Sequence, residues 1–259
     1  MTHLVDQLLA IAWPQGVPQR LDELIDRPLC DDLLEDFKMG LVFPLDDSDR
    51  PVRLALSCQG ERNRWRQSVM ARWPSPSLTG LFDSAPSDTR LMVDSDGSDQ
   101  AVVYLDDLQR VDHDLQVPAG LELLAWTVAL PAGTDGFLTR HREPPHPWVP
   151  TSLAPSLKGL LENGAEGIWA IRWHHDAPVA ALWISESRWR RNPAMSRRIV
   201  AGLGTHPSYD AAQQCLADHG REGYPDAVEL RRDGGIEVTL GVLEAGAEVK
   251  PGGEGPCRR

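Results

Sequence analysis

The sequence predicts an internally duplicated α+β fold in which antiparallel β-hairpins alternate with helices. Three observations lead to this fold class: an internal repeat, pairs of short apolar segments joined by polar turns, and helical segments between those pairs. The chain has 259 residues, of which 41% are hydrophobic and 25% charged. It is therefore long enough to bury a substantial core, and its composition is that of a folded globular protein.

The repeat appears when the sequence is compared with itself at an offset of 127, which aligns residues 28–52 with residues 155–179 without a gap. After a short gap the match resumes, with Arg-Trp-Arg at 64–66 against Arg-Trp-Arg at 188–190. We interpret the match as a duplication of one helix-plus-hairpin unit. The identical pairs in the ungapped stretch are Pro28 and Pro155, Leu33 and Leu160, Leu34 and Leu161, Glu35 and Glu162, Gly40 and Gly167, Asp49 and Asp176, Pro51 and Pro178, and Val52 and Val179.

Helices are expected where apolar residues recur at helical spacing and suitable residues stand at the ends. In the second copy, Pro155 suits a first helical turn, and Asn163-Gly164 supplies a C-terminal stop. The sequence predicts helices over residues 1–16, 62–72, 155–164, 188–201 and 209–218.

Five β-hairpins are expected between and after these helices. Two of them turn through an Asp-Gly dipeptide, at Asp96-Gly97 and Asp233-Gly234, which is a strong local signal for a tight hairpin. The predicted strand pairs are 40–45 with 52–58, 90–93 with 101–105, 121–130 with 137–140, 167–173 with 178–185, and 227–230 with 236–242.

A proline-rich seam over residues 144–150 separates the two copies. We expect the first copy, with the N-terminal helix and the middle hairpin, to span residues 1–143 and the second copy to span 151–246. Residues 247–259 lack an apolar period and are expected to form a disordered tail. Each copy alone would expose a sheet face, so we expect one pseudo-symmetric body, with the halves packed together or the sheet closed into a barrel.

The charge balance limits the partners. The formal net charge is −12, which opposes binding to nucleic-acid phosphates or to an anionic membrane surface. The first residues lack the basic start and the uninterrupted apolar run of a signal peptide, and no stretch approaches a membrane span. We therefore expect a soluble, cytoplasmic protein without a nucleic-acid or membrane partner, and the sequence does not specify an oligomeric state.

No cofactor and no metal site are expected. The four cysteines are widely spaced and include no Cys-x-x-Cys pair. His174-His175-Asp176 stands at a predicted hairpin tip, and the first copy has Asp47-Ser48-Asp49 there, so we interpret the position as a polar turn. The chain also lacks a Gly-x-Ser-x-Gly nucleophile elbow and a phosphate-binding glycine loop.

The succession of five antiparallel hairpins separated by helices resembles the PT-barrel, or ABBA, architecture of the soluble aromatic prenyltransferases. In that architecture ten strands close into a barrel and the substrates react inside it. The resemblance covers most of the chain and is one of pattern, without a matched sequence motif. It implies a barrel or cleft that binds a small anionic ligand, with metal-independent transfer of a prenyl group to an aromatic acceptor. Two fused ferredoxin-like units would give a similar strand count.

For such a transfer, cationic side chains would surround a diphosphate leaving group, and aromatic walls would stabilise an allylic cation. Strand alternation places Arg172 on the face opposite to Trp169 and Ile171. The arginines also fit the wet side of an ordinary sheet, and the tryptophans fit an ordinary core. No catalytic residue can be named; the expected ligand-binding residues are Arg53, Arg90, Arg140, Arg172 and Arg231, with Trp126 and Trp183 as walls.

The alternative function is a non-enzymatic interaction module, of the assembly-factor, chaperone or immunity type, whose acidic surface would bind a basic protein. It is motivated by the net charge of −12 and by the lack of a compact catalytic motif. Whether the protein is an enzyme stays open between the two. A closed barrel with a basic, aromatic interior favours a ligand, whereas a filled core with an exposed apolar or acidic face favours a protein partner.

Overall fold

The computed structural model of the chain describes residues 4–25, 37–45, 50–58, 62–84, 91–98, 100–106, 121–130, 132–141, 151, 154–162, 168–174, 177–178, 180–185, 193–231 and 233–244. The helices in these ranges are α1 (Leu4–Ala12), α2 (Gln19–Asp22), α4 (Arg62–Arg72), α5 (Pro76–Ser84), α6 (Ala154–Glu162), α7 (Pro193–Leu203) and α8 (Pro207–Asp218). The strands are β1 (Phe37–Pro44), β2 (Arg53–Cys58), β3 (Leu91–Ser95), β4 (Ala101–Asp106), β5 (Glu122–Leu130), β6 (Thr134–His141), β7 (Ile168–His174), β8 (Ala177–Pro178), β9 (Ala180–Ser185), β10 (Arg221–Arg231) and β11 (Ile236–Glu244).

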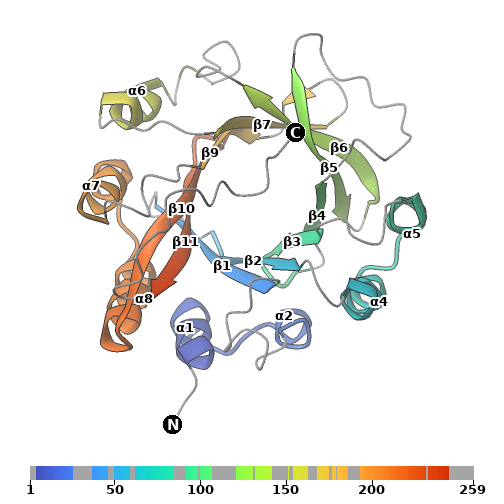
Figure 1. Ribbon diagram of the computed structural model, residues 1–259, viewed down its shortest axis with the longest axis horizontal. Coiled ribbons are helices and arrows are strands. Elements are labelled where there is room, and N and C mark those ends of the chain that lie inside the picture. Colours follow the sequence, from blue (N-terminus) through green and yellow to red (C-terminus); the bar gives the residue numbers. More distant parts are fainter. Residues whose placement is uncertain are drawn as a thin grey trace.

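The strands form one antiparallel sheet that closes into a ring, as Figure 1 shows. The order of neighbours is β6-β5-β4-β3-β2-β1-β11-β10-β9-β7, and β6 also pairs with β7, which joins the two ends. The short β8 extends the sheet from β7. In the described ranges each strand of the ring has a partner on both sides, so the ring itself has no edge strand. The predicted α+β fold of antiparallel hairpins is confirmed, and the sheet is a closed barrel.

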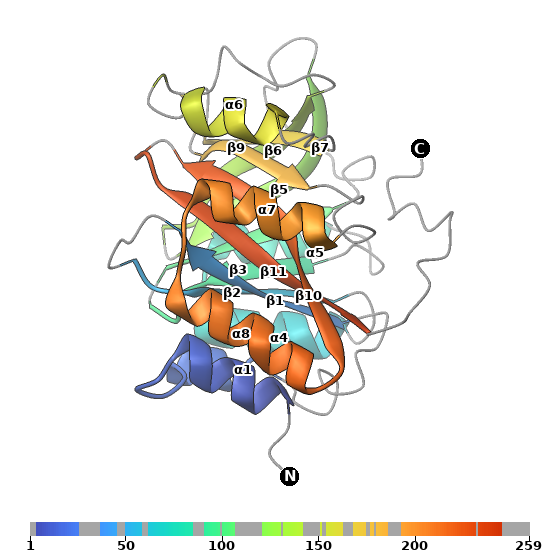
Figure 2. The same ribbon diagram turned by 90° about the vertical axis from the view of Figure 1, so that its left-hand side faces the viewer.

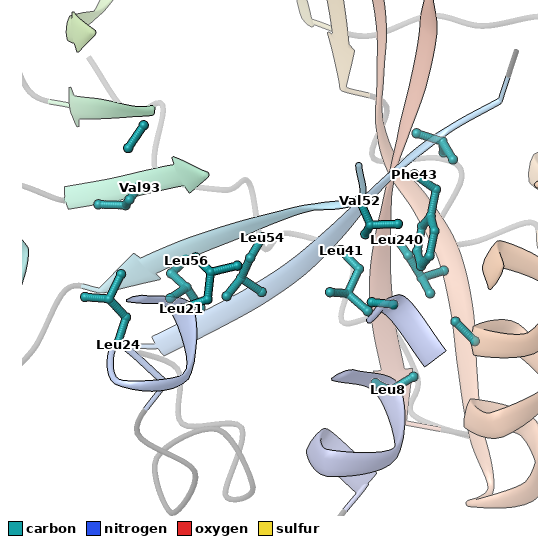
Figure 3. Packing of buried hydrophobic residues seen from close by; sticks show 14 of the residues in the cluster. Leu8, Leu21, Leu24, Leu41, Phe43, Val52, Leu54, Leu56, Val93 and Leu240 are labelled. Carbon is teal, nitrogen blue, oxygen red and sulfur yellow. The ribbon is translucent and has the colours of Figure 1, made fainter. Parts of the chain in front are cut away.

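The helices lie outside this ring (Figure 1). Helices α7 and α8 run along β10, and α1 lies against α8, as the side view in Figure 2 shows. Apolar side chains of the helices belong to the same core as the outward-facing strand residues; Figure 3 shows Leu21 of α2 beside Leu56 of β2. The main hydrophobic core therefore occupies the layer between the barrel and its helices.

Strand β2 shows how the sequence separates the two faces of the barrel. Leu54 and Leu56 are each 1% exposed and belong to the outer apolar core. Because neighbouring residues on a strand point to opposite faces, Arg53 and Ala55 face the inside of the barrel. Arg53 directly precedes the core residue Leu54, so strand alternation places its guanidinium group on the inner face of the barrel.

All five predicted hairpins are present, as β1–β2, β3–β4, β5–β6, β7–β9 and β10–β11. Both Asp-Gly turns form as predicted, with φ of 84° at Gly97 and 91° at Gly234, values that glycine adopts without strain. Strand β10 begins at Arg221, earlier than residue 227, because the register shifts between Pro225 and Ala227 and accommodates the proline within the strand.

A helix forms in each of the five predicted segments, and two further helices, α2 and α5, were not predicted. Helix α4 begins and ends as predicted, whereas α5 follows a Pro-Ser-Pro run at 74–76. In the structure Ser75 Oγ accepts a hydrogen bond from the Leu78 backbone N at 3.5 Å, and Pro76 occupies the first helical position. The run is therefore a helix start. No helix in the described ranges is long and apolar enough to cross a membrane.

The duplication stays a prediction, because the two hairpins differ in register. Leu41 pairs with Leu54 in the first copy, and the offset of 127 would pair Ile168 with residue 181. Instead Ile168 pairs with Ser185. The predicted seam at 144–150 and the predicted tail at 247–259 lie outside the described residues.

Candidate functional site

Charged side chains meet inside the barrel. They come from strands that are not neighbours in the sheet, such as β2 and β10 or β4 and β7, and such strands can exchange side-chain contacts only across the interior. We call this group the interior cluster, and it consists of Arg53, Asp94, Tyr104, Arg172, Glu229, Arg231 and Glu237.

Arg53, at the start of β2, is the centre of the interior cluster. Its Nη1 donates a hydrogen bond to Asp94 Oδ2 on β3. Its Nη2 donates to Glu237 Oε2 on β11 and, at 3.2 Å, to Glu229 Oε2 on β10. The side chain is 15% exposed. One buried guanidinium thus binds carboxylates from three strands, which its planar fork of donors allows.

Arg172 extends the interior cluster to the opposite side of the barrel. Its Nη1 donates to the Tyr104 hydroxyl oxygen at 2.7 Å, and its Nη2 lies 3.9 Å from Glu229 Oε1. Glu229 therefore joins the two buried arginines. The network ties β2, β4, β7 and β10 together across the interior, in addition to the hydrogen bonds of the sheet.

The β10–β11 turn positions the part of the interior cluster nearest to solvent. Glu237 Oε1 accepts a hydrogen bond from Arg50 Nη1 at 3.0 Å and lies 3.6 Å from Arg231 Nη1. Asp233 in the turn accepts from the Gly235 backbone N at 3.0 Å and from Arg231 Nε at 3.3 Å. The Arg50 and Arg231 side chains are 23% and 30% exposed, compared with 15% for Arg53.

Burial and the neighbouring charges shift the pKa values of the interior cluster in opposite directions. Burial lowers the pKa of Arg53, but Asp94, Glu229 and Glu237 outweigh it and raise that pKa well above its usual value. Burial raises the pKa of Glu229, but Arg53 and Arg172 outweigh it and lower that pKa. For Asp94 and Glu237, burial outweighs the arginines and raises the pKa. Two of the three carboxyl groups are therefore incompletely compensated.

The structure brings three of the predicted ligand-binding arginines together, since Arg53, Arg172 and Arg231 all belong to the interior cluster. Arg140 on β6 pairs with Ala170, two residues from Arg172 on β7, and so faces the same interior. Arg90 lies outside the described residues.

The two tryptophans predicted as aromatic walls, Trp126 and Trp183, lie at different faces of the barrel. Trp126 is half-buried and packs against the apolar core outside the barrel, so we leave it out of the interior site. The backbone of Trp183 stands opposite Ala170 and Glu229, at an inward register position. Trp169 and Ile171 lie on the outer face and Arg172 on the inner one, as strand alternation predicts.

Sequence reasoning missed the acceptors of the interior cluster. Asp94, Tyr104, Glu229 and Glu237 are not among the ligand-binding residues that the sequence predicts. A signal was present: Glu229 interrupts the apolar run from Ala227 to Leu230, where strand alternation places it on the face opposite to Val228. In the described part of the chain, no group of three or more His, Cys, Asp or Glu side chains is arranged to hold a metal ion.

Known proteins resemble this chain in structure but not in sequence. No family model matches the sequence, and no curated protein matches it. The crystal structure of 5-dimethylallyltryptophan synthase from Streptomyces coelicolor covers 94% of this chain and 91% of its own, with a TM-score of 0.52 and 15% identity.

Two complexes match in the same way. The Streptomyces coelicolor enzyme with DMASPP and Trp covers 96% of this chain and 92% of its own, with a TM-score of 0.54 and 15% identity. The 6-dimethylallyltryptophan synthase from Micromonospora olivasterospora with DMASPP and Trp covers 90% and 85%, with a TM-score of 0.55 and 15% identity. The predicted resemblance to the PT-barrel architecture of the aromatic prenyltransferases is therefore confirmed at the level of the fold.

Proposed function

We propose that the protein binds a small allylic diphosphate and an aromatic acceptor inside the barrel and transfers the prenyl group without a metal ion. The observation that carries the proposal is the interior cluster: charged and hydrogen-bonding side chains from six strands converge inside a closed barrel, while the main apolar core lies outside it. The likeness in fold to synthases whose complexes hold DMASPP and Trp supports the same use of the interior.

Arg140 is the described arginine that best suits the diphosphate. It faces the interior, is half-buried, and has no carboxylate partner among the described residues. Arg53, by contrast, has both Nη atoms bound to carboxylates. A guanidinium that protein carboxylates have not neutralised keeps more of its attraction for an anion, and burial strengthens that attraction. Arg90 and Trp183 remain further proposed contacts for the ligand.

The chemistry of the transfer defines what the interior must supply. The bond between the allylic carbon and the diphosphate oxygen breaks, and the electron pair stays on that oxygen. A carbon–carbon bond forms to the acceptor ring, which then loses a proton to a base. Cationic side chains stabilise the leaving oxygen, and aromatic faces stabilise the allylic cation.

The test is a thermal-shift series with dimethylallyl, geranyl and farnesyl diphosphate and with inorganic diphosphate, followed by product analysis. A ligand that binds only the folded protein raises its unfolding temperature. We expect stabilisation by an allylic diphosphate, and a prenylated product with L-tryptophan in the presence of a metal chelator. If none of the four compounds stabilises the protein and no product forms, the proposal is wrong, and binding to a basic protein becomes the function to test.

A variant pair sharpens this test. Arg140→Met should weaken stabilisation by inorganic diphosphate, because it removes the interior cation that we assign to the anion. Arg198→Met makes the same change on the exposed surface of α7 and should leave that stabilisation unchanged. Equal stabilisation of both variants would remove Arg140 from the site.

A further inference from the structure

Two oxygens of the interior cluster lack a hydrogen-bond partner among the described residues. They are Asp94 Oδ1 and Glu229 Oε1, on residues that are each only 9% exposed. The other oxygen of each carboxyl group accepts a hydrogen bond from Arg53. Arg172 Nη2 lies 3.9 Å from Glu229 Oε1, which is too far for a hydrogen bond. Because buried acceptors without donors are costly, these two oxygens require a donor that the described chain does not supply.

The charges around these oxygens are balanced. Together with Arg50 and Asp233, the interior cluster contains equal numbers of arginine and carboxylate side chains. Glu237 is compensated from the more exposed side by Arg50 and Arg231, which leaves the two most deeply buried arginines for the other two carboxylates of the cluster. A neutral donor would therefore satisfy the two oxygens without disturbing the charge balance.

The wall beside Asp94 is formed by small side chains and is open to the interior. Ala55 on β2 and Val102 on β4 pair with Asp94 from either side, so all three face inward. Ala55 and Val102 are only half-buried, so solvent reaches this part of the inner wall. Water is neutral and has two O–H donors, and buried waters bind polar groups that have no other partner. It therefore matches both the charge balance and the two acceptors.

We propose that Asp94 and Glu229 bind and activate a water molecule, so that the protein also hydrolyses its allylic diphosphate to the prenyl alcohol. The inference rests on the proposed function for the binding of the allylic diphosphate. It adds a second reaction, in which water takes the place of the aromatic acceptor while Arg140 holds the diphosphate as before.

The chemistry assigns different roles to the two carboxyl groups. The bond between the allylic carbon and the diphosphate oxygen breaks, and the electron pair stays on that oxygen. A lone pair of the water forms the new carbon–oxygen bond, and one water proton passes to Asp94 Oδ1. Burial raises the pKa of Asp94, whereas at Glu229 Arg53 and Arg172 outweigh burial and lower the pKa. Asp94 is therefore the base, and Glu229 accepts the hydrogen bond that orients the water.

Isotopically labelled water tests this inference with the wild-type full chain. The protein is incubated with dimethylallyl diphosphate and a metal chelator, without an aromatic acceptor. We expect prenyl alcohol and inorganic diphosphate to form faster than in the absence of protein, with the label in the alcohol. A water held at one position should also give a single isomer of the alcohol. The inference is wrong if no alcohol forms above the background or if the label enters the diphosphate.

Variants then identify the residues. Asp94→Asn should lower the rate of hydrolysis at saturating diphosphate at least about a hundredfold, because it removes the base. Glu229→Gln should lower it less, and neither change should alter the KM, because Arg140 binds the diphosphate. Asp83→Asn makes the same change on the exposed end of α5 and should leave the rate unchanged. Equal rates for Asp94→Asn and Asp83→Asn would overturn the inference.

The pH profile of the wild type provides a readout that does not depend on how a substitution folds. The rate of hydrolysis should fall on acidification, because a protonated Asp94 cannot accept the proton of the water. A rate that does not change as pH falls would contradict the role of Asp94 as the base.

Addition of L-tryptophan separates this inference from the proposed function. An aromatic product in its presence, without any alcohol in its absence, would overturn hydrolysis and leave prenyl transfer standing. Alcohol without an aromatic product would overturn prenyl transfer and leave the water site standing. Where both products form, L-tryptophan should reduce the yield of alcohol, because water and the ring compete for the same allylic carbon.

Discussion

The two faces of the same barrel use opposite means of holding the chain together. On the outer face, Leu54 and Leu56 pack into an apolar layer beneath the helices. On the inner face, one residue away, Arg53 binds three carboxylates from three other strands. Apolar packing tolerates some imprecision in geometry, whereas a buried ion network is stable only while every member is present. The apolar layer outside the barrel therefore stabilises the fold. The polar side chains inside it are the ones available for contacts with a ligand.

Among the substitutions that test this difference between the two faces, removal of the Arg53 guanidinium group should have the largest effect on stability. Arg53→Met leaves Asp94, Glu229 and Glu237 without their shared cation, and we expect the free energy of unfolding to fall by about 4 kcal/mol, as is usual when one partner of a buried ion pair is removed. Chemical denaturation measures the change. Arg198→Met, the exposed control on α7, should change stability by no more than about 0.5 kcal/mol. Similar losses in both variants would mean that the inner network does not depend on Arg53.

The neighbouring residue tests the outer layer. Leu54→Ala removes a side chain that is 1% exposed and packed between β2 and the helices, and we expect a loss of about 3 kcal/mol from the missing contacts and the residual cavity. The same denaturation experiment measures it. The loss should be independent of salt and of pH between 5 and 8, in contrast to effects on the inner network. A loss below about 1 kcal/mol would show that the outer layer repacks around the change.

The sequence predicted the outer face better than the inner one, and the reason is physical. Hairpins and helices follow from periodicity and from turn residues such as Gly97 and Gly234, which act over a few neighbouring positions. The partners of the interior cluster are distant along the chain: Arg53 is 176 residues from Glu229 and 184 from Glu237. Alternation alone predicts which side chains face inward, but not which strands lie opposite one another. The ring order that brings β2 to β10 was needed to find the acceptors.

A smaller effect is expected from the hydrogen bond between Arg172 and Tyr104. Tyr104→Phe keeps the ring and removes the oxygen that accepts from Arg172 Nη1 at 2.7 Å. Because a hydrogen bond to a charged group is worth more than a neutral one, we expect a loss of about 2 kcal/mol in the free energy of unfolding. The combined variant Tyr104→Phe with Arg172→Met should lose less than the sum of the two single changes. Strict additivity would show that the two side chains do not act together.

The smallest effect is a pH dependence that only the inner face should show. Burial raises the folded-state pKa of Asp94 above its ordinary value, so the folded protein holds that proton more tightly than the unfolded chain does. Between the ordinary aspartate pKa of about 3.9 and the raised folded value, stability should therefore fall as pH rises, by at most about 1.4 kcal/mol per pH unit. Asp94→Asn has no proton to lose at this position. The measurement is the free energy of unfolding of both proteins across this range.

The difference between wild type and Asp94→Asn isolates this carboxyl group. Glu237, whose pKa is also raised, and Glu229, whose pKa is lowered, are present in both proteins, so to first order their contributions cancel. As pH rises, we expect the free energy of unfolding of the wild type to fall relative to that of the Asp94→Asn variant. A difference that stays constant, or that grows in favour of the wild type, would mean that Arg53 compensates Asp94 completely. In that case the buried ion network of the inner face would be fully compensated, and its stability would not depend on the protonation of Asp94.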